Sequence, residues 1–133
     1  MRLLADTSVI VNSLRSIRTR ASALFDQQMA EGALPSITPD IYREVLQGAK
    51  DADHFRALRE HLVRMPMVAV ADGLNMQSGS AWLYASLRWR GITINSAIDC
   101  TIALTAVEND LALLHDDQDF LAIARVEPRL KLA

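Results

Sequence analysis

Residues 2–11 read Arg-Leu-Leu-Ala-Asp-Thr-Ser-Val-Ile-Val, and this stretch decides the expected fold. An apolar run ends at Asp6, and apolar residues then return at helical spacing up to Leu14. The pattern predicts a strand over residues 2–5, a turn, and a helix over residues 9–14. A short apolar strand that leads directly into a helix is typical of a parallel sheet covered by helices.

The same alternation continues along the chain. Short apolar runs predict further strands over residues 33–37, 67–70, 111–114 and 130–132. Helical spacing and capping residues predict helices over residues 21–31, 39–47, 51–62, 72–90, 97–108 and 120–124. With no internal repeat or linker, the sequence predicts one domain over residues 1–133, an α/β protein with a single three-layer α/β/α sandwich and a mainly parallel central sheet.

Composition restricts the class of protein. The 133 residues are 50 % hydrophobic and 23 % charged, which suits a folded core and argues against a disordered chain. The single cysteine, Cys100, allows no internal disulfide, and no apolar run approaches the roughly 20 residues that span a bilayer. We therefore expect a cytoplasmic protein with no membrane partner. The net charge of −2 gives no general attraction to a polyanion, so any contact with nucleic acid must be local.

Acidic residues stand at the expected carboxyl edge of the sheet, where ligands bind in such folds. Asp6 ends the first strand and Asp117 follows the strand over residues 111–114. Glu44 and Asp99 lie within the first two turns of helices that could pack on the same edge. Two carboxylates about 5 Å apart repel by roughly 3 kcal/mol at an effective dielectric of about 20, so their convergence requires a cation. Oxygen ligands favour Mg²⁺, with Mn²⁺ as a substitute.

Each acid also has a structural interpretation. Ser96 and Asp99 could form a capping box at the start of a helix. Glu44 could be an ordinary exposed helical residue, and Asp6 could simply cap the helix that follows it. Only the joint placement of the acids favours a site.

Several neighbouring residues are expected to be structural. We interpret Asp116 and Asp119 as a solvated turn and a helix cap. Three aromatic side chains could stack on nucleic-acid bases, but aromatic residues at helical spacing are more often buried or at a dimer contact. We expect them in the core: Trp82, Trp89 and Phe120.

Four segments, in this order and at this spacing, resemble those of PIN-domain nucleases, and the resemblance covers essentially the whole chain. The segments are Leu-Ala-Asp6-Thr-Ser, Thr38-Pro-Asp-Ile-Tyr-Arg-Glu44-Val-Leu-Gln-Gly, Ile98-Asp99-Cys-Thr-Ile-Ala and Leu114-His-Asp-Asp117-Gln-Asp119-Phe. The chain length and the stretch from Gly91 to Cys100 are most similar to VapC-type toxins of bacterial toxin–antitoxin pairs.

The resemblance implies a Mg²⁺-dependent endoribonuclease that acts as the toxin of a type II, VapBC-like pair. The four acidic positions of the family match Asp6, Glu44, Asp99 and Asp117. The implied metal ligands are Asp6, Asp99 and Asp117, while Glu44 would hold or deprotonate the attacking water. We expect in-line hydrolysis of RNA that leaves a 5′-phosphate and a 3′-hydroxyl.

Four polar residues near the acids either match the family pattern or depart from it. Thr7 and Ser8 match the hydroxyl position after the first aspartate, where they could orient Asp6 or a scissile phosphate. His115 stands where relatives usually carry threonine or serine, and either a phosphate contact or a harmless substitution is compatible with it. Asn95 stands where relatives often carry arginine, which could weaken a contact to RNA or to a partner.

A basic loop follows the first predicted helix. We expect Arg15, Arg18 and Arg20 to lie on the side of the sheet that carries the acids and to contact RNA phosphates, although a solvated loop is equally compatible. The implied partners are RNA, a small cognate VapB-like antitoxin whose C-terminal segment would lie across the acidic cleft, and a second copy of the chain in a homodimer.

Two other functions remain open at this stage. One is a PIN-domain nuclease that acts in RNA processing without a toxin role. The other is a noncatalytic or receiver-like α/β binding domain, which would need a lysine at the end of a late strand. The only lysines are Lys50 and Lys131, so this alternative is remote.

Overall fold

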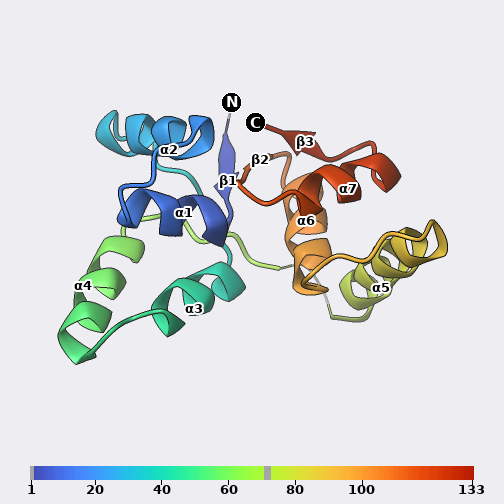
Figure 1. Ribbon diagram of the computed structural model, residues 1–133, viewed down its shortest axis with the longest axis horizontal. Helices are drawn as coiled ribbons and strands as arrows, with labels where there is room; N and C mark the ends of the chain where they lie inside the picture. The colour runs from blue at the N-terminus through green and yellow to red at the C-terminus, as the bar shows by residue number, and fades with distance from the viewer. Residues whose placement is uncertain (1, 71–72) are drawn as a thin grey trace.

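A computed structural model describes residues 2–70 and 73–133 of the chain (Figure 1). Its regular strands are β1 (Leu3–Ala5), β2 (Ala112–Leu114) and β3 (Lys131–Leu132). They form a parallel sheet in the order β1-β2-β3, with Ala5 of β1 opposite Leu114 of β2. The helices are α1 (Thr7–Leu14), α2 (Arg20–Ala30), α3 (Pro39–Gln47), α4 (Ala52–Leu62), α5 (Gly73–Trp89), α6 (Ile98–Glu108) and α7 (Asp119–Val126).

The sheet continues beyond β1 through single bridges. Ser36 pairs with Leu4 and Ile37 pairs with Met67, both in the parallel sense. The amide of Ser36 donates to the carbonyl of Leu3 at 2.8 Å, and the amide of Ala5 donates to the carbonyl of Ser36 at 2.9 Å. Five chain segments therefore lie in register, although only three of them are regular strands within the described residues.

The strands predicted over residues 33–37 and 67–70 were too long. Pro35 has no amide hydrogen to give to a neighbouring strand. Thr38 then accepts the amide hydrogen of Ile41 on its hydroxyl and begins α3, so the backbone turns away after two paired residues. The segment over residues 67–70 pairs with Ile37 and, among the described residues, has no strand to pair with after the chain turns into α3 at Thr38.

Helices flank the sheet on both sides, which confirms the predicted α/β class with a parallel sheet. Figure 1 shows α1 to α4 to the left of β1 and α5 to α7 to its right. Within each group the helices pack on one another, α1 against α2 and α3, and α5 against α6 and α7. Every residue of β1 and β2 is buried as a result. The predicted helices are confirmed, with ends shifted by a few residues; Asp72, the expected start of α5, lies outside the described residues.

The aromatic residues divide between core and surface. Phe120 is fully buried, as predicted. Trp82 and Trp89 were wrongly assigned to the core, because each is 64 % exposed. They pack edge to face with ring centroids 5.3 Å apart on the outer face of α5, while Leu83 and Leu87 bury its inner face. Apolar residues on both faces of this helix made the buried side impossible to identify from spacing alone.

Membrane-spanning helices are absent from residues 2–70 and 73–133, where none is both long and apolar enough to cross a bilayer.

Candidate active site

Asp6 lies where the carboxyl ends of β1 and β2 meet. Its amide donates to the carbonyl of Leu114, the last residue of β2, at 3.0 Å. The residue is 4 % exposed, and its Oδ2 accepts hydrogen bonds from the Ser8 amide at 3.0 Å and the Ser8 hydroxyl at 2.6 Å. Burial raises the pKa of Asp6, although the bonds from Ser8 oppose the shift. Asp6 therefore caps α1, and its carboxylate also stands at the predicted edge of the sheet.

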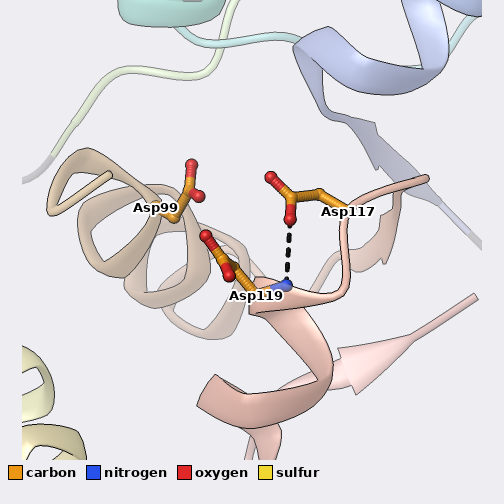
Figure 2. A group of neighbouring side chains, drawn as sticks. All are labelled: Asp99, Asp117 and Asp119. Atoms are coloured by element: carbon orange, nitrogen blue, oxygen red, sulfur yellow. Dashed lines mark hydrogen bonds between the residues drawn. The ribbon is translucent and has the colours of Figure 1, made fainter. Parts of the chain in front are cut away.

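Three further carboxylates form a compact group at the same edge. One oxygen each of Asp99, Asp117 and Asp119 lies within 4.8 Å of the others. Figure 2 shows the three carboxylates gathered between α6 and the turn that precedes α7. Asp99 is in the first turn of α6, Asp117 is in the turn after β2, and Asp119 begins α7. Asp117 Oδ1 also accepts the amide hydrogen of Asp119 at 2.9 Å.

Asp119 is a candidate site residue that the sequence interpretation missed. It does not cap its own helix, because its Oδ2 accepts the amide hydrogen of Asn95 at 2.8 Å. That bond holds the segment before α6 against the start of α7. The available signal was the spacing from Asp117, since two acids two residues apart at a strand-to-helix turn can both face one centre.

The capping box considered as the structural alternative for Ser96 and Asp99 is absent. The cap residue of α6 is Ala97, and no side chain bonds to the free amides there. The carboxylate of Asp99 is instead buried, with the residue 7 % exposed. Burial first, and then the negative charges of the surrounding acids, raise the pKa of Asp99 to about 8. The carboxylate of Asp99 therefore belongs to the acidic group and does not cap α6.

Glu44 reaches the same centre from α3. It is half-buried, and burial followed by the charge of Asp6 raises its pKa. The nearby hydroxyl of Thr7 partly offsets this shift, yet Thr7 Oγ1 makes no hydrogen bond of ordinary geometry and is buried. An unpartnered buried hydroxyl near the carboxylate of Glu44 is open to a ligand or water.

The donor set fits a hard divalent cation. The structure groups Asp99, Asp117 and Asp119, and the charges of Asp6 and Glu44 act on Asp99 from nearby. All their donor atoms are carboxylate oxygens, the ligands that Mg²⁺ and Mn²⁺ prefer. Burial first, and then the charges of the neighbouring acids, disfavour an ionised Asp99, and a bound cation would oppose both effects.

His115 is placed as a neutral structural group. Its Nδ1 accepts the amide hydrogen of Asp117 at 3.2 Å, and its ring packs on Phe120 with centroids 5.3 Å apart. Burial lowers its pKa despite the nearby acids. The imidazole therefore shapes the turn that carries Asp117 rather than offering a cation to a phosphate.

Asp116 is not simply a solvated residue of the turn. Although it is exposed, its Oδ2 accepts hydrogen bonds from Asn12 Nδ2 at 2.9 Å and from Thr19 Oγ1 at 2.6 Å. Its own amide donates to Ser8 Oγ at 3.0 Å. The turn after β2 is thus tied to α1 and to the start of α2.

The predicted basic residues Arg15, Arg18 and Arg20 are exposed. Arg20 Nη1 donates to the carbonyl of Ala133 at 3.3 Å, just beyond the carboxyl end of β3. Arg15 caps the other end of α1 from Asp6, and Arg18 precedes Thr19 in the loop. The role predicted for these arginines in RNA binding stays a prediction.

The sequence was compared with protein families and with individual relatives. A model of the PIN domain matches residues 3–126. The chain is 30 % identical over 125 residues to a VapC ribonuclease of Mycobacterium bovis and to ribonuclease VapC11 of Mycobacterium tuberculosis. Each alignment covers 93 % of this chain and 92 % of the relative.

The fold was compared with solved structures. The crystal structure of VapBC2 from Rickettsia felis, bound to a promoter DNA fragment, contains a chain that matches with a TM-score of 0.74 and 16 % identity, covering 100 % of this chain and 98 % of that one. A DNA-bound VapBC from Salmonella typhimurium matches with a TM-score of 0.73 and 14 % identity, covering 100 % and 97 %. At these identities the likeness concerns the fold.

Proposed function

The chain belongs to the PIN-domain family, and from this premise we propose that it is a metal-dependent endoribonuclease that acts as the toxin of a toxin–antitoxin pair. The observation that carries the proposal is the group of Asp99, Asp117 and Asp119 oxygens within 4.8 Å of one another, beside Asp6 and Glu44. The names of the relatives, VapC ribonucleases, support the reaction class.

Asp99, Asp117 and Asp119 would hold the cation, and Asp6 would supply a further carboxylate near them. We propose Mg²⁺, with Mn²⁺ as a substitute. When bound, the cation supplies Lewis-acid activation of water and neutralises the charge that develops on the phosphate.

The remaining steps fall to side chains of the chain. Glu44 accepts a proton from the attacking water, and its raised pKa suits a general base that must both take and release a proton. The Thr7 hydroxyl donates to the water or to a phosphate oxygen, which satisfies its unpartnered Oγ1. Ser8 holds the carboxylate of Asp6 in one orientation. The water oxygen bonds to phosphorus as the bond to the 3′-oxygen breaks, and the departing 3′-oxygen takes a proton from solvent, which leaves a 5′-phosphate and a 3′-hydroxyl.

The partners proposed are RNA and a small VapB-like antitoxin. The exposed arginines of the loop over residues 15–20 would contact RNA phosphates. A groove of about 370 Å³ between α1, α3 and α4 combines apolar walls, such as Leu58, with Arg15 and Lys50, which suits an antitoxin segment that carries apolar and acidic residues. A homodimer is also proposed, and the exposed Trp82 and Trp89 offer it an apolar surface on α5.

The test is cleavage of RNA by the purified protein with Mg²⁺, with chelator, and with Asp99→Asn. Cleavage should require the metal, return when Mg²⁺ is restored, and be lost in the variant. Asp53→Asn, at an exposed aspartate paired with Arg56 on α4, is the matched control and should cleave normally. Full cleavage in chelator, or by Asp99→Asn, would reject the proposal.

An antitoxin partner distinguishes the toxin role from a role in RNA processing. A small antitoxin encoded beside this chain should bind it and inhibit cleavage. RNA cleavage with no such neighbour would favour the processing role instead.

A further inference from the structure

Asp116 makes more contacts with distant parts of the chain than its exposure suggests. One oxygen accepts hydrogen bonds from two donors that are 104 and 97 residues away, Asn12 on α1 and Thr19 at the cap of α2. Hydrogen bonds to a charged acceptor are shorter and stronger than neutral ones. The bond from Thr19 is 2.6 Å long. The carboxylate therefore joins the turn over residues 115–118, here called the acidic turn, to two helices.

The backbone of the same residue reaches Asp6. The Asp116 amide donates to Ser8 Oγ at 3.0 Å, and that hydroxyl donates to Asp6 Oδ2 at 2.6 Å. Ser8 Oγ is thus a bridge between the acidic turn and the carboxylate at the end of β1. A shift of the turn would move Asp117, the next residue, and would also release the Ser8 hydroxyl from Asp6.

Thr19 connects this arrangement to the basic loop. Its Oγ1 accepts the amide hydrogen of Ser22 at 2.9 Å while it donates to Asp116, and Ser22 Oγ in turn donates to the carbonyl of Ile17 at 2.9 Å. Arg18 and Arg20 flank Thr19 in the sequence. The loop that carries these two arginines is therefore fastened to the turn that carries Asp117.

The geometry points to Asp116 as a positioning residue, which holds the acidic turn against α1 and α2 so that Asp117 and Asp6 face one centre with the basic loop beside it. This inference rests on the proposed metal site and deepens it. We assign the side chain no ligand role, because its Oδ2 bonds to Asn12 and Thr19 and the residue is not part of the group formed by Asp99, Asp117 and Asp119. Mutation of a residue that orients metal ligands in this way typically lowers metal affinity or activity by roughly 10-fold to 100-fold.

The test compares Asp116→Ala with Asp116→Asn in the full chain. Alanine removes the acceptor, whereas asparagine keeps one oxygen that can accept from both donors. Mn²⁺ binding by calorimetric titration and the kcat and KM for an RNA oligonucleotide are measured for each. We expect Asp116→Ala to weaken Mn²⁺ binding roughly 10-fold and to lower kcat, and Asp116→Asn to stay within about 3-fold of the wild type.

A second variant tests the same bonds from the other side. Asn12→Ala should lower Mn²⁺ affinity in the same direction, and its effect should not add fully to that of Asp116→Ala, because both break one arrangement. This variant also serves if Asp116→Ala fails to fold. Asp53→Ala removes an equally exposed aspartate that lies on α4 and should change neither quantity.

The outcomes separate this inference from the proposed function. If the wild type neither binds Mn²⁺ nor cleaves RNA, the proposed function and the positioning role of Asp116 are both wrong. A wild type that does both, with Asp116→Ala and Asn12→Ala matching it, overturns the positioning role alone. Equal losses in Asp116→Asn and Asp116→Ala also overturn it, since the hydrogen-bond acceptor would then not be the cause.

Discussion

Asp99→Asn should stabilise the metal-free protein while it abolishes cleavage. The pKa of Asp99 rises from 3.8 to about 8 on folding, because the carboxylate is buried among other acids. Each pKa unit corresponds to about 1.4 kcal/mol. At pH 7 the unfolded carboxyl has lost its proton, whereas the folded carboxyl keeps it. The wild type is therefore less stable at this pH than a chain with no ionisable group here, by a free energy on the order of 4 kcal/mol.

The sign of the pH dependence follows from the direction of the shift. The folded state binds the proton more tightly than the unfolded state, so the stability associated with Asp99 is fully present below about pH 4 and is lost as the pH rises to about 8. Asparagine has nearly the same shape and cannot ionise. The free energy of unfolding of the variant should thus exceed that of the wild type by a margin that grows between about pH 5 and about pH 8.

Urea unfolding in chelator at both pH values measures this margin, with Asp53→Asn as the control because that side chain is 96 % exposed. Saturating Mn²⁺ should narrow the difference, since binding at about 100 times the Kd stabilises the wild type by about 2.7 kcal/mol and should hardly affect the variant. A variant that is no more stable than the wild type at pH 8, or a margin independent of pH, would refute the account of the acidic centre.

Three further predictions concern other residues. Asp119→Asn should weaken Mn²⁺ binding by roughly 10-fold in a calorimetric titration, because it removes a charged oxygen from the group of three, and unchanged binding would exclude it from the site. Replacing the three arginines of the loop over residues 15–20 by glutamine should weaken RNA binding and flatten its salt dependence by roughly 0.7 in logarithmic slope per lost phosphate contact; an identical slope would exclude the loop from RNA binding. Phe120→Ala should cost about 3–5 kcal/mol in urea unfolding and Trp89→Ala less than about 1 kcal/mol, because their exposed fractions are 0 % and 64 %, and equal costs would contradict that burial.

Much of the architecture could be predicted because it depends on near neighbours in the chain. The apolar run before Asp6, the cap at Thr38 and the spacing within α6 are local patterns, and local sterics and hydrogen bonding decide helix or strand. The alternation of short strands with helices then restricts the sheet to a parallel one. The placement of acids after β1 and β2 follows from that topology, since parallel strands end at one edge.

Local patterns could not show which side chains are buried or which groups a polar side chain contacts. Trp82 and Trp89 have the spacing of core residues, but α5 packs on α6 and α7 through its other face, so both tryptophans stay exposed. Ser96 and Asp99 have the spacing of a capping box, but a buried acidic centre takes the carboxylate instead.

The sequence by itself determined the class of fold and the order of the elements, and it predicted four acids at one edge of the sheet. Only the tertiary structure decided that Asp119 joins them and that Asp116 bonds to Asn12 and Thr19. The reason is physical: a hydrogen bond or a charge interaction depends on distance in space. Donors about 100 residues away in the chain become neighbours only when both helix groups have packed on the sheet.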